Sequence, residues 1–130
     1  MEPVAPEVTF ITPVFDAEET LPAALDRILG QETKRPFEVV IVDDGSRDRS
    51  YELAEKIAAA HPGRVKALTK KNGGEASALN VGFREARGRF LAIVEGAVEI
   101  DPKWLETCLA VLESEPLCAR GGQQIVAGQP

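Results

Sequence analysis

The sequence has few of the residues that mark disulfide-bonded or membrane-spanning proteins. Its 130 residues include two cysteines, Cys108 and Cys118, which are not in a Cys-x-x-Cys spacing. Two cysteines cannot form a disulfide scaffold, so reduced thiols are expected. No apolar run approaches the ~20 residues that cross a bilayer, and residues 1–7 are acidic and proline-rich, unlike a signal or transit peptide. We therefore expect a cytoplasmic chain without a membrane span.

The sequence also lacks an excess of basic residues. It contains 15 lysines and arginines against 21 acidic residues, for a net charge of -6. Nucleic-acid-binding domains usually present a basic face, so this balance predicts that the chain has no nucleic-acid partner. An anionic small ligand is still compatible with it, because local cations or a bound metal can override the net charge.

Internal repeats and low-complexity segments are absent, and apolar, β-branched segments alternate with segments of helical period. We expect strands at residues 8–12, where Pro13 ends the run, and at 37–42, 65–68 and 89–94, with a fifth strand opening within 117–126. The helices expected between them carry apolar residues three and four positions apart, at Leu21, Leu25 and Ile28; Leu53 and Ile57; Ala76, Leu79, Phe83 and Ala86; and Leu105, Cys108, Leu109 and Leu112. Thr20 and Asp101 are the expected caps of the first and last helices.

Four β-α units with nearly continuous apolar strands predict an α/β fold, a Rossmann-like, mostly parallel sheet flanked by helices. We expect a flexible segment over residues 1–7 and one domain over residues 8–130. The carboxyl ends of the strands then meet at one edge of the sheet, where ligands bind in such folds.

The loop after the first expected strand, residues 13–19, is acidic and contains no glycine. A dinucleotide-binding Rossmann loop needs glycines for its close approach to pyrophosphate, so that class of site is excluded here. The loop either faces a base, a ribose or a metal, or is a solvated loop that precedes a helix.

Acidic residues also follow the second and fourth expected strands. Asp43 and Asp44 can accept hydrogen bonds from a base N-H or from ribose hydroxyls, or they can belong to an Asp-Gly turn in which Asp48 caps the next helix. Glu95 is a candidate ligand of a hard cation, which prefers oxygen donors. Asp101 has the simpler role of a helix cap.

After the third expected strand, Lys70, Lys71 and the pair Gly73-Gly74 precede a helix. Backbone amides at a helix N-terminus and lysines both attract phosphate, so this segment is a candidate anion cradle. Asn80 lies within the helix, where asparagine gains little from propensity, which favours a task for its side chain. The alternative is an ordinary loop with a solvent-facing Asn80.

These segments together resemble the inverting family-two glycosyltransferases of the GT-A fold. The resemblance rests on Pro13-Val14-Phe15-Asp16-Ala17-Glu18, with Asp for the usual Asn, on Val42-Asp43-Asp44-Gly45-Ser46-Arg47-Asp48, on the run from Asn72 to Gly82, and on Ala86-Arg87-Gly88. It covers residues 8–113 and identifies the chain as the N-terminal, nucleotide-binding portion of such an enzyme.

The resemblance implies a nucleotide-sugar donor, most often a uridine diphosphate sugar, and inverting transfer to an acceptor hydroxyl. The residues that it implies for the nucleoside pocket are Phe15, Asp16, Glu18, Asp43 and Asp44. Those implied beside the base and the diphosphate are Lys71, Asn72 and Asn80. It also implies a Mg²⁺ or Mn²⁺ ion at Glu95.

The chain departs from the family pattern in two ways. The family's fourth strand ends in Asp-x-Asp, whereas here Glu95-Gly96-Ala97 lacks the second carboxylate. Family members also continue for about another hundred residues that supply the acceptor site and the general base, so we expect the acceptor half to be absent from these 130 residues. No catalytic base is assigned.

Three alternatives follow from these residues. A non-catalytic nucleotide-sugar-binding module is compatible with both departures. A phospho-accepting receiver domain needs a lone aspartate after the third strand, where this chain has Lys70-Lys71, and a nucleoside triphosphatase needs a P-loop, which is absent. We also expect an exposed sheet edge beyond the fourth strand, through which a second copy or another chain can pair.

Overall fold

A computed structural model of the chain describes residues 5–112, 117–120 and 123–127. Strands and helices alternate in the order β1 (Val8–Val14), α1 (Leu21–Leu29), β2 (Phe37–Asp43), α2 (Ser50–Ala60), β3 (Val65–Thr69), α3 (Glu75–Glu85), β4 (Phe90–Ile93), α4 (Trp104–Leu112), β5 (Leu117–Arg120) and β6 (Gln123–Ala127). The four β-α units predicted from the sequence are confirmed. The segment expected to open a fifth strand forms two strands, β5 and β6.

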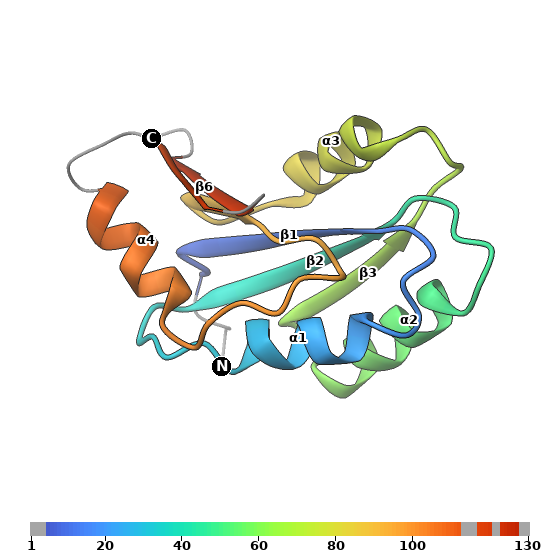
Figure 1. Ribbon diagram of the computed structural model, residues 1–130, viewed down its shortest axis with the longest axis horizontal. Coiled ribbons are helices and arrows are strands. Elements are labelled where there is room, and N and C mark those ends of the chain that lie inside the picture. Colours follow the sequence, from blue (N-terminus) through green and yellow to red (C-terminus); the bar gives the residue numbers. More distant parts are fainter. Residues whose placement is uncertain (1–4, 113–116, 121–122, 128–130) are drawn as a thin grey trace.

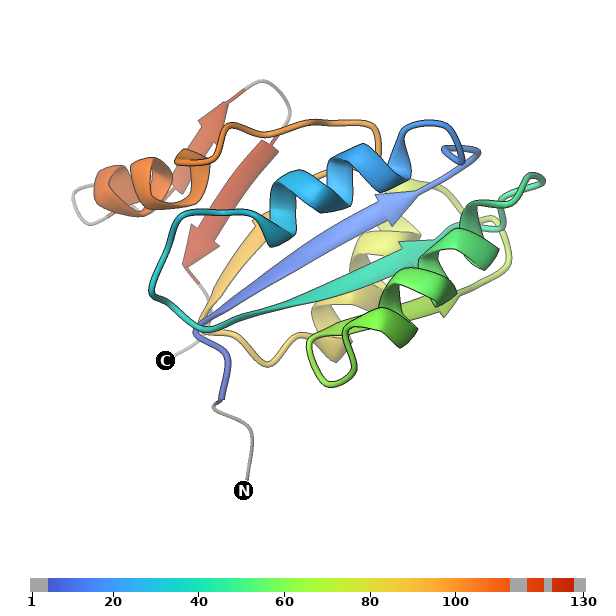
Figure 2. The same cartoon turned by 90° about the horizontal axis from the view of Figure 1, so that it is seen from below.

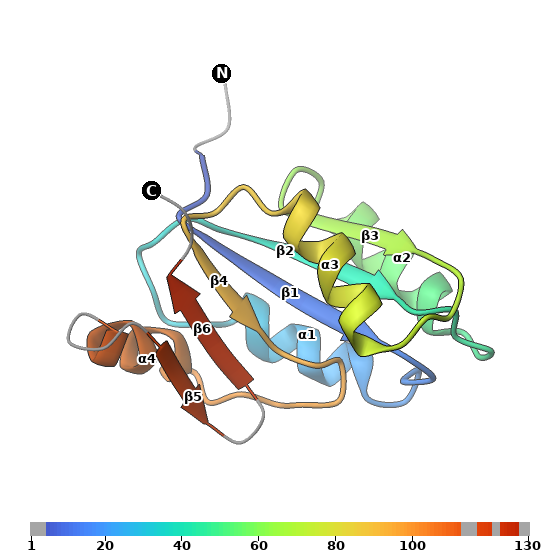
Figure 3. The same cartoon turned by 90° about the horizontal axis from the view of Figure 1, so that it is seen from above.

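The strands form one sheet in the order β3-β2-β1-β4-β6-β5. Strand β1 pairs in parallel with both β2 and β4, so that Val8 lies opposite Phe37 on one side and Phe90 on the other. Strand β6 runs antiparallel to β4, and β5 antiparallel to β6 (Figure 3). The predicted mostly parallel sheet is therefore confirmed, with the parallel part contained in β1 to β4.

Helices cover both faces of the parallel strands, as Figures 1 and 2 show, with α1 and α2 on one face and α3 on the other. The larger core lies under α1, α2 and α4 and includes Phe10, Leu25 and Ile41. The ring of Phe10 meets that of Phe37 edge-to-face, with centroids 5.2 Å apart, a favourable arrangement for two aromatic rings. The apolar period predicted for α1 is confirmed, since Leu21, Leu25 and Ile28 are all buried.

Helix α3 packs on the sheet through a different face from the one that its large apolar residues mark. Ala78 and Gly82 are its buried residues, while the side chain of Phe83 is 42% exposed. A Cβ atom at Gly82 would lie 2.4 Å from Cγ2 of Ile11 on β1. The missing side chain lets the helix approach β1 closely, so small residues decide which face of α3 turns to the sheet.

Two local expectations are corrected. Strand β1 continues through Pro13 to Val14, because the Pro13 carbonyl accepts a hydrogen bond from the Gly96 amide, beyond the point where β4 ends. The missing N-H of the proline is on the side of β4, which ends at Ile93, while on the other side Pro13 and Val14 stay in register with Val42 and Asp43 of β2. Thr20 occupies the N-cap position of α1 without capping it, since its hydroxyl donates to the Gly96 carbonyl at 3.1 Å.

Asp101 does cap the turn that leads into α4, because its carboxylate accepts a hydrogen bond from the Lys103 amide at 2.8 Å. Glu7 marks the predicted boundary between residues 1–7 and the domain. Its amide donates to the Pro36 carbonyl, and its carboxylate pairs with Arg35. Residues 1–4 lie outside the described part, so the flexible segment stays a prediction.

The edge expected to be exposed beyond β4 is paired with β6, so within the described sheet the outer strands are β3 and β5. Pairing of the chain through either of these strands stays a prediction. Among the described helices, none has the length and apolar character needed to cross a bilayer. The cytoplasmic location stays a prediction as well.

The amino ends of the parallel strands are joined by a buried carboxylate. Glu38 on β2 accepts hydrogen bonds from the Thr9 hydroxyl at 2.6 Å, from the Arg87 amide at 2.8 Å and from Arg87 Nε at 3.0 Å. The Thr9 hydroxyl in turn accepts from the Gly88 amide at 2.8 Å. This network holds the segment between α3 and β4 against β1 and β2.

We expect Glu38→Ala to lower the free energy of unfolding by about 2–3 kcal/mol, because it leaves the buried Thr9 hydroxyl and Arg87 amide without their acceptor. Urea unfolding followed by circular dichroism measures the change. A matched control is Glu85→Ala, which removes an exposed ion pair with Lys66 and should cost less than about 1 kcal/mol. Equal losses in the two variants would contradict a structural role for the Glu38 network.

Candidate functional site

A pocket of about 350 Å³ lies at the carboxyl ends of β1, β2 and β4, the edge where the sequence placed the site. Four of the predicted site residues line it, namely Phe15, Asp44, Asn72 and Glu95. An adjoining hollow of about 290 Å³ shares Phe15 and is lined by the predicted residues Asp16 and Glu18. Asp43, Lys71 and Asn80 are not among the described residues that line either space.

Phe15 lines both spaces, and the next residue, Asp16, lines the second one. Phe15 is 46% exposed, whereas the apolar residues of β1, which ends one residue before it, are buried. Asp16 has a φ of 46°, a left-handed conformation that aspartate tolerates better than most residues. The Ser46 hydroxyl holds this conformation by accepting a hydrogen bond from the Asp16 amide at 2.9 Å.

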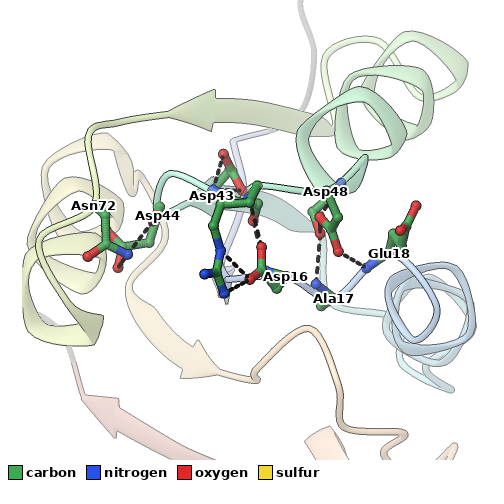
Figure 4. A network of polar contacts seen from close by, with 10 residues as sticks. Asp16, Ala17, Glu18, Asp43, Asp44, Asp48 and Asn72 are labelled. Atoms are coloured by element: carbon green, nitrogen blue, oxygen red, sulfur yellow. Dashed lines mark hydrogen bonds and ion pairs between the residues drawn. The ribbon is translucent and has the colours of Figure 1, made fainter.

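Asp43 lies behind the pocket as a buried anchor of the β2–α2 loop. Its carboxylate accepts hydrogen bonds from the Thr69 hydroxyl at 2.9 Å and from the Ser46 amide at 3.3 Å. Asp48 fastens the neighbouring loop, because it accepts from the Ser50 hydroxyl at 2.6 Å and from the Glu18 amide at 3.2 Å (Figure 4). These two carboxylates therefore position the loops that carry Phe15 and Asp44.

Asp44 is buried at the junction of β2 and the segment that precedes α3. The amides of Gly73 and Gly74 each donate to one of its carboxylate oxygens at 3.0 Å, and Lys70 Nζ donates at 3.1 Å. The side-chain amide of Asn72 donates to the Asp44 backbone carbonyl at 2.9 Å (Figure 4). Burial alone would raise the pKa of the Asp44 carboxyl, but the hydrogen bonds from Gly73, Lys70 and Gly74 outweigh it and hold this pKa below its ordinary value.

This arrangement corrects one expectation from the sequence. The amides of Gly73 and Gly74 and the ammonium group of Lys70 do form an anion cradle, but its anion is the Asp44 carboxylate of the chain itself. The cradle is therefore not open to a phosphate group in this structure. Lys71 and Asn80 are exposed.

Glu95, which follows β4, and Glu75, the first residue of α3, both line the pocket. Burial, together with a hydrogen bond and charge repulsion from Glu75, raises the pKa of the Glu95 carboxyl. Two carboxylates in contact share either a proton or a cation. The sequence-predicted metal ligand Glu95 therefore has a carboxylate neighbour, although Ala97 supplies none.

The segment after β4 is locked against the β1–α1 loop. A Cβ atom at Gly96 would lie 2.8 Å from Cγ2 of Val14, so a larger residue there would push Glu95 away from β1. The Gly96 amide and carbonyl are both engaged, by Pro13 and Thr20 respectively. Glycine at this position is therefore what allows Glu95 and Ala97 to border the pocket.

Sequence reasoning missed two residues of this edge, Glu75 and Arg47. Glu75 begins a helix, where an acidic residue is expected for capping alone, and its meeting with Glu95 depends on how α3 lies across the sheet. Arg47 directly follows the Asp43-Asp44-Gly45-Ser46 segment and pairs with Asp16, 31 residues earlier, which the sequence alone does not reveal. Position 16 carries Asp where the family usually has Asn, and this added negative charge is the feature of the sequence that could have predicted a cationic partner.

The described residues contain no group of three or more His, Cys, Asp or Glu side chains arranged to hold a metal ion. The available donor set is the carboxylate pair Glu75 and Glu95. Magnesium sites that act on phosphates commonly use one or two carboxylates and take the remaining ligands from the substrate and water. The pair therefore fits a cation that binds together with a diphosphate, and does not form a closed structural site.

Comparison with known proteins adds the following findings. The family model for glycosyl transferase family 2 matches residues 9–127. An undecaprenyl-phosphate 4-deoxy-4-formamido-L-arabinose transferase of Pectobacterium carotovorum is 34% identical over 100 residues, which are 74% of this chain and 30% of that protein. The chain thus spans less than a third of this relative's length.

Two solved structures are similar in fold. Staphylococcus aureus TarS 1-349 in complex with UDP-GlcNAc is 25% identical with a TM-score of 0.71, over 85% of this chain and 33% of that one. The mannosyltransferase PcManGT of Pyrobaculum calidifontis, in complex with GDP-Man and Mn²⁺, has a TM-score of 0.81 over 95% of this chain and 45% of that one. At 21% identity, the latter shows the fold alone.

The depressed pKa of Asp44 predicts a loss of stability in acid. A carboxyl whose folded pKa is lowered stabilises the fold fully above its ordinary value of 3.8, and this contribution is lost as the pH falls through the lower folded value. We expect Asp44→Asn to cost about 2 kcal/mol at pH 7, with a difference from wild type that shrinks below the ordinary pKa. Urea unfolding at pH values from 7 to 3 measures this.

The control for this experiment is Asp26→Asn, at an exposed position of α1, which should change the free energy of unfolding by less than about 0.5 kcal/mol. If the cost of Asp44→Asn stays the same from pH 7 to pH 3, the ionised carboxylate is not what holds the Gly73-Gly74 segment.

Proposed function

Because this chain belongs to glycosyltransferase family 2, we propose that it forms the donor site of an enzyme that transfers a sugar from a uridine diphosphate sugar to an acceptor hydroxyl with inversion. The nucleoside lies against Phe15, Asp44 and Asn72, and the diphosphate extends toward Glu95. Asp16 and Glu18 border the neighbouring hollow, Asp43 supports the base pocket from behind, and Lys71 and Asn80 lie beside the diphosphate.

One observation carries this proposal. The pocket of about 350 Å³ is lined both by the exposed aromatic ring of Phe15 and by the carboxylates of Glu75 and Glu95, which interact with each other. The ring supplies a flat apolar surface for a base, and the pair supplies oxygen donors for a cation that accompanies a diphosphate. The pocket volume lies in the range of small-molecule and cofactor sites.

The ligands of the structural neighbours support the class of donor. TarS binds UDP-GlcNAc and PcManGT binds GDP-Man with Mn²⁺. Both are nucleoside diphosphate sugars, and the described residues of this chain have the fold of those proteins. For this chain we propose uridine diphosphate as the nucleotide portion.

Glu95 and Glu75 would hold the Mg²⁺ or Mn²⁺ ion. A bound cation of this kind neutralises the charge that develops on the leaving diphosphate. The task of the chain's own residues is to keep the two carboxylates together, through the packing of α3 on β1 and through the fit of Gly96 against Val14. Glu75 thus takes the place of the second carboxylate that Ala97 lacks.

A second candidate function is a nucleotide-sugar-binding module without transferase activity. Ala97, in the place of the usual second aspartate, favours it. Such a module would bind nucleotide equally well with and without a cation, because its Glu75–Glu95 pair would then hold a shared proton.

Calorimetric titration of the chain with UDP, in Mn²⁺ and again in chelator, tests these proposals. We expect binding that weakens by about tenfold or more in chelator, and Glu75→Gln or Glu95→Gln to weaken the Mn²⁺-dependent binding to a similar degree, since even indirect disturbance of metal ligands changes affinity by about 10–100-fold. The electron paramagnetic resonance signal of Mn²⁺ reports ion binding independently of activity.

The charge-matched control is Glu52→Gln on α2, where Glu52 pairs with Arg49 at the surface, and it should leave both signals unchanged. Binding of UDP that is equal in Mn²⁺ and chelator would favour the binding module. Absence of UDP binding under both conditions would contradict the proposed donor.

A further inference from the structure

Arg47 lies beside Phe15, a lining residue of the pocket, and is held there by two neighbouring residues. Its Nε and Nη2 atoms donate to one carboxylate oxygen of Asp16 at 3.0 Å and 2.6 Å, and its backbone amide donates to the other oxygen at 2.7 Å. The centre of its guanidinium group also lies 5.4 Å from the centroid of the Phe15 ring, within the range of a cation–π interaction. Arg47 therefore has a defined position although its side chain is 81% exposed.

The position of Asp16 is maintained against an unfavourable backbone conformation. Its φ of 46° is held through the hydrogen bond from its amide to the Ser46 hydroxyl, and its carboxylate faces Arg47. Backbone strain of this kind persists where the surroundings enforce it, and it gathers at functional sites. Here it joins the β1–α1 loop to the β2–α2 loop beside Phe15, which lines both hollows.

The carboxylates at this edge already accept hydrogen bonds from the protein. Asp43 accepts from Thr69 and Ser46, and Asp44 accepts from three donors described above. Asp16 is engaged by Arg47, whose hydrogen bonds lower the pKa of the Asp16 carboxyl. The acceptors that the sequence predicted for a base N-H are thus occupied in this structure.

Arg47, in contrast, has donors left over. A guanidinium group carries five N-H groups, and Asp16 uses one on Nε and one on Nη2. The three others are free of Asp16, and the aromatic ring next to them borders the pocket. The polar edge offered beside Phe15 is therefore rich in donors.

We propose that Arg47, fixed by Asp16 and Phe15, is a specificity-determining residue of the donor site that donates hydrogen bonds to a carbonyl oxygen of the nucleobase. The inference rests on the proposed function, because it requires that a nucleotide bind in this pocket. In this proposal Arg47 recognises the base, and Asp16 holds Arg47 in position.

The proposal makes a chemical distinction between bases. Uracil and guanine carry carbonyl oxygens that accept hydrogen bonds from arginine, whereas the corresponding edge of adenine carries an amino group, which is itself a donor. A guanidinium group at this place favours the first two bases. If Arg47 instead bound phosphate, it would contribute equally to every nucleoside diphosphate.

The test compares the binding of UDP, GDP and ADP to the whole chain and to its variants by calorimetry in Mn²⁺. We expect Arg47→Ala to weaken UDP and GDP binding by about tenfold, the loss of one or two charge-assisted hydrogen bonds, and to change ADP binding by less than about twofold. Arg47→Lys keeps the charge without the planar fork, and should lose most of the same selectivity.

The matched control is Arg49→Ala, which removes the same charge two residues along the same loop, where Arg49 pairs with Glu52. It should leave all three affinities unchanged, and thermal unfolding of each variant shows whether the fold is intact. Asp16→Asn tolerates the left-handed backbone but loses the ionic partner of Arg47, so it should lower the preference for UDP over ADP while Arg47 remains.

Two results would overturn the inference alone. In the first, wild type binds UDP and Arg47→Ala weakens the binding of all three nucleotides equally, which means that Arg47 contacts the diphosphate. In the second, Arg47→Ala leaves all three affinities unchanged, which means that Arg47 contacts neither the base nor the diphosphate. If wild type binds no nucleotide at all, the proposed function fails and this inference fails with it.

Discussion

The carboxylate of Asp44 is the contact on which the rest of the candidate site depends. It joins the end of β2 to the segment before α3 by accepting two backbone amides and an ammonium group. The Gly73 and Gly74 amides and the Lys70 ammonium group are thereby paired with a carboxylate of the chain itself. Because the chain supplies its own anion there, the N-terminus of α3 has a defined place, and Glu75 with it.

The same principle extends over the whole edge of the sheet. Asp16, Asp43, Asp44 and Asp48 all accept hydrogen bonds from donors of the protein, and Asp16 and Asp44 also pair with Arg47 and Lys70 (Figure 4). At the pocket, the carboxylates of Glu75 and Glu95 form a described pair of like charges that repel each other. Such an edge can receive an anionic ligand, provided that a cation or a proton reaches this pair.

Much of the architecture could be predicted from the sequence, because apolar periodicity reports burial directly. The four β-α units, their order and the edge that carries the site all follow from it. The face of α3 could not be predicted, since Gly82 contributes no apolar signal while its contact with Ile11 decides the packing. The hydrogen bonds from the Gly73 and Gly74 amides to Asp44 could not be predicted either. The sequence shows an acidic residue and a candidate anion-binding segment, but not that the two are in contact.

The Glu38 network lies at the amino ends of the strands, at the opposite edge of the sheet from the pocket. Determinants of folding and determinants of ligand choice are thereby separated by the length of the strands. Changes in the Phe15 to Glu19 loop, or at Arg47, can accumulate without loosening the segment that holds β4 in place. A scaffold divided in this way can exchange one donor for another over evolutionary time while the sheet beneath it stays the same.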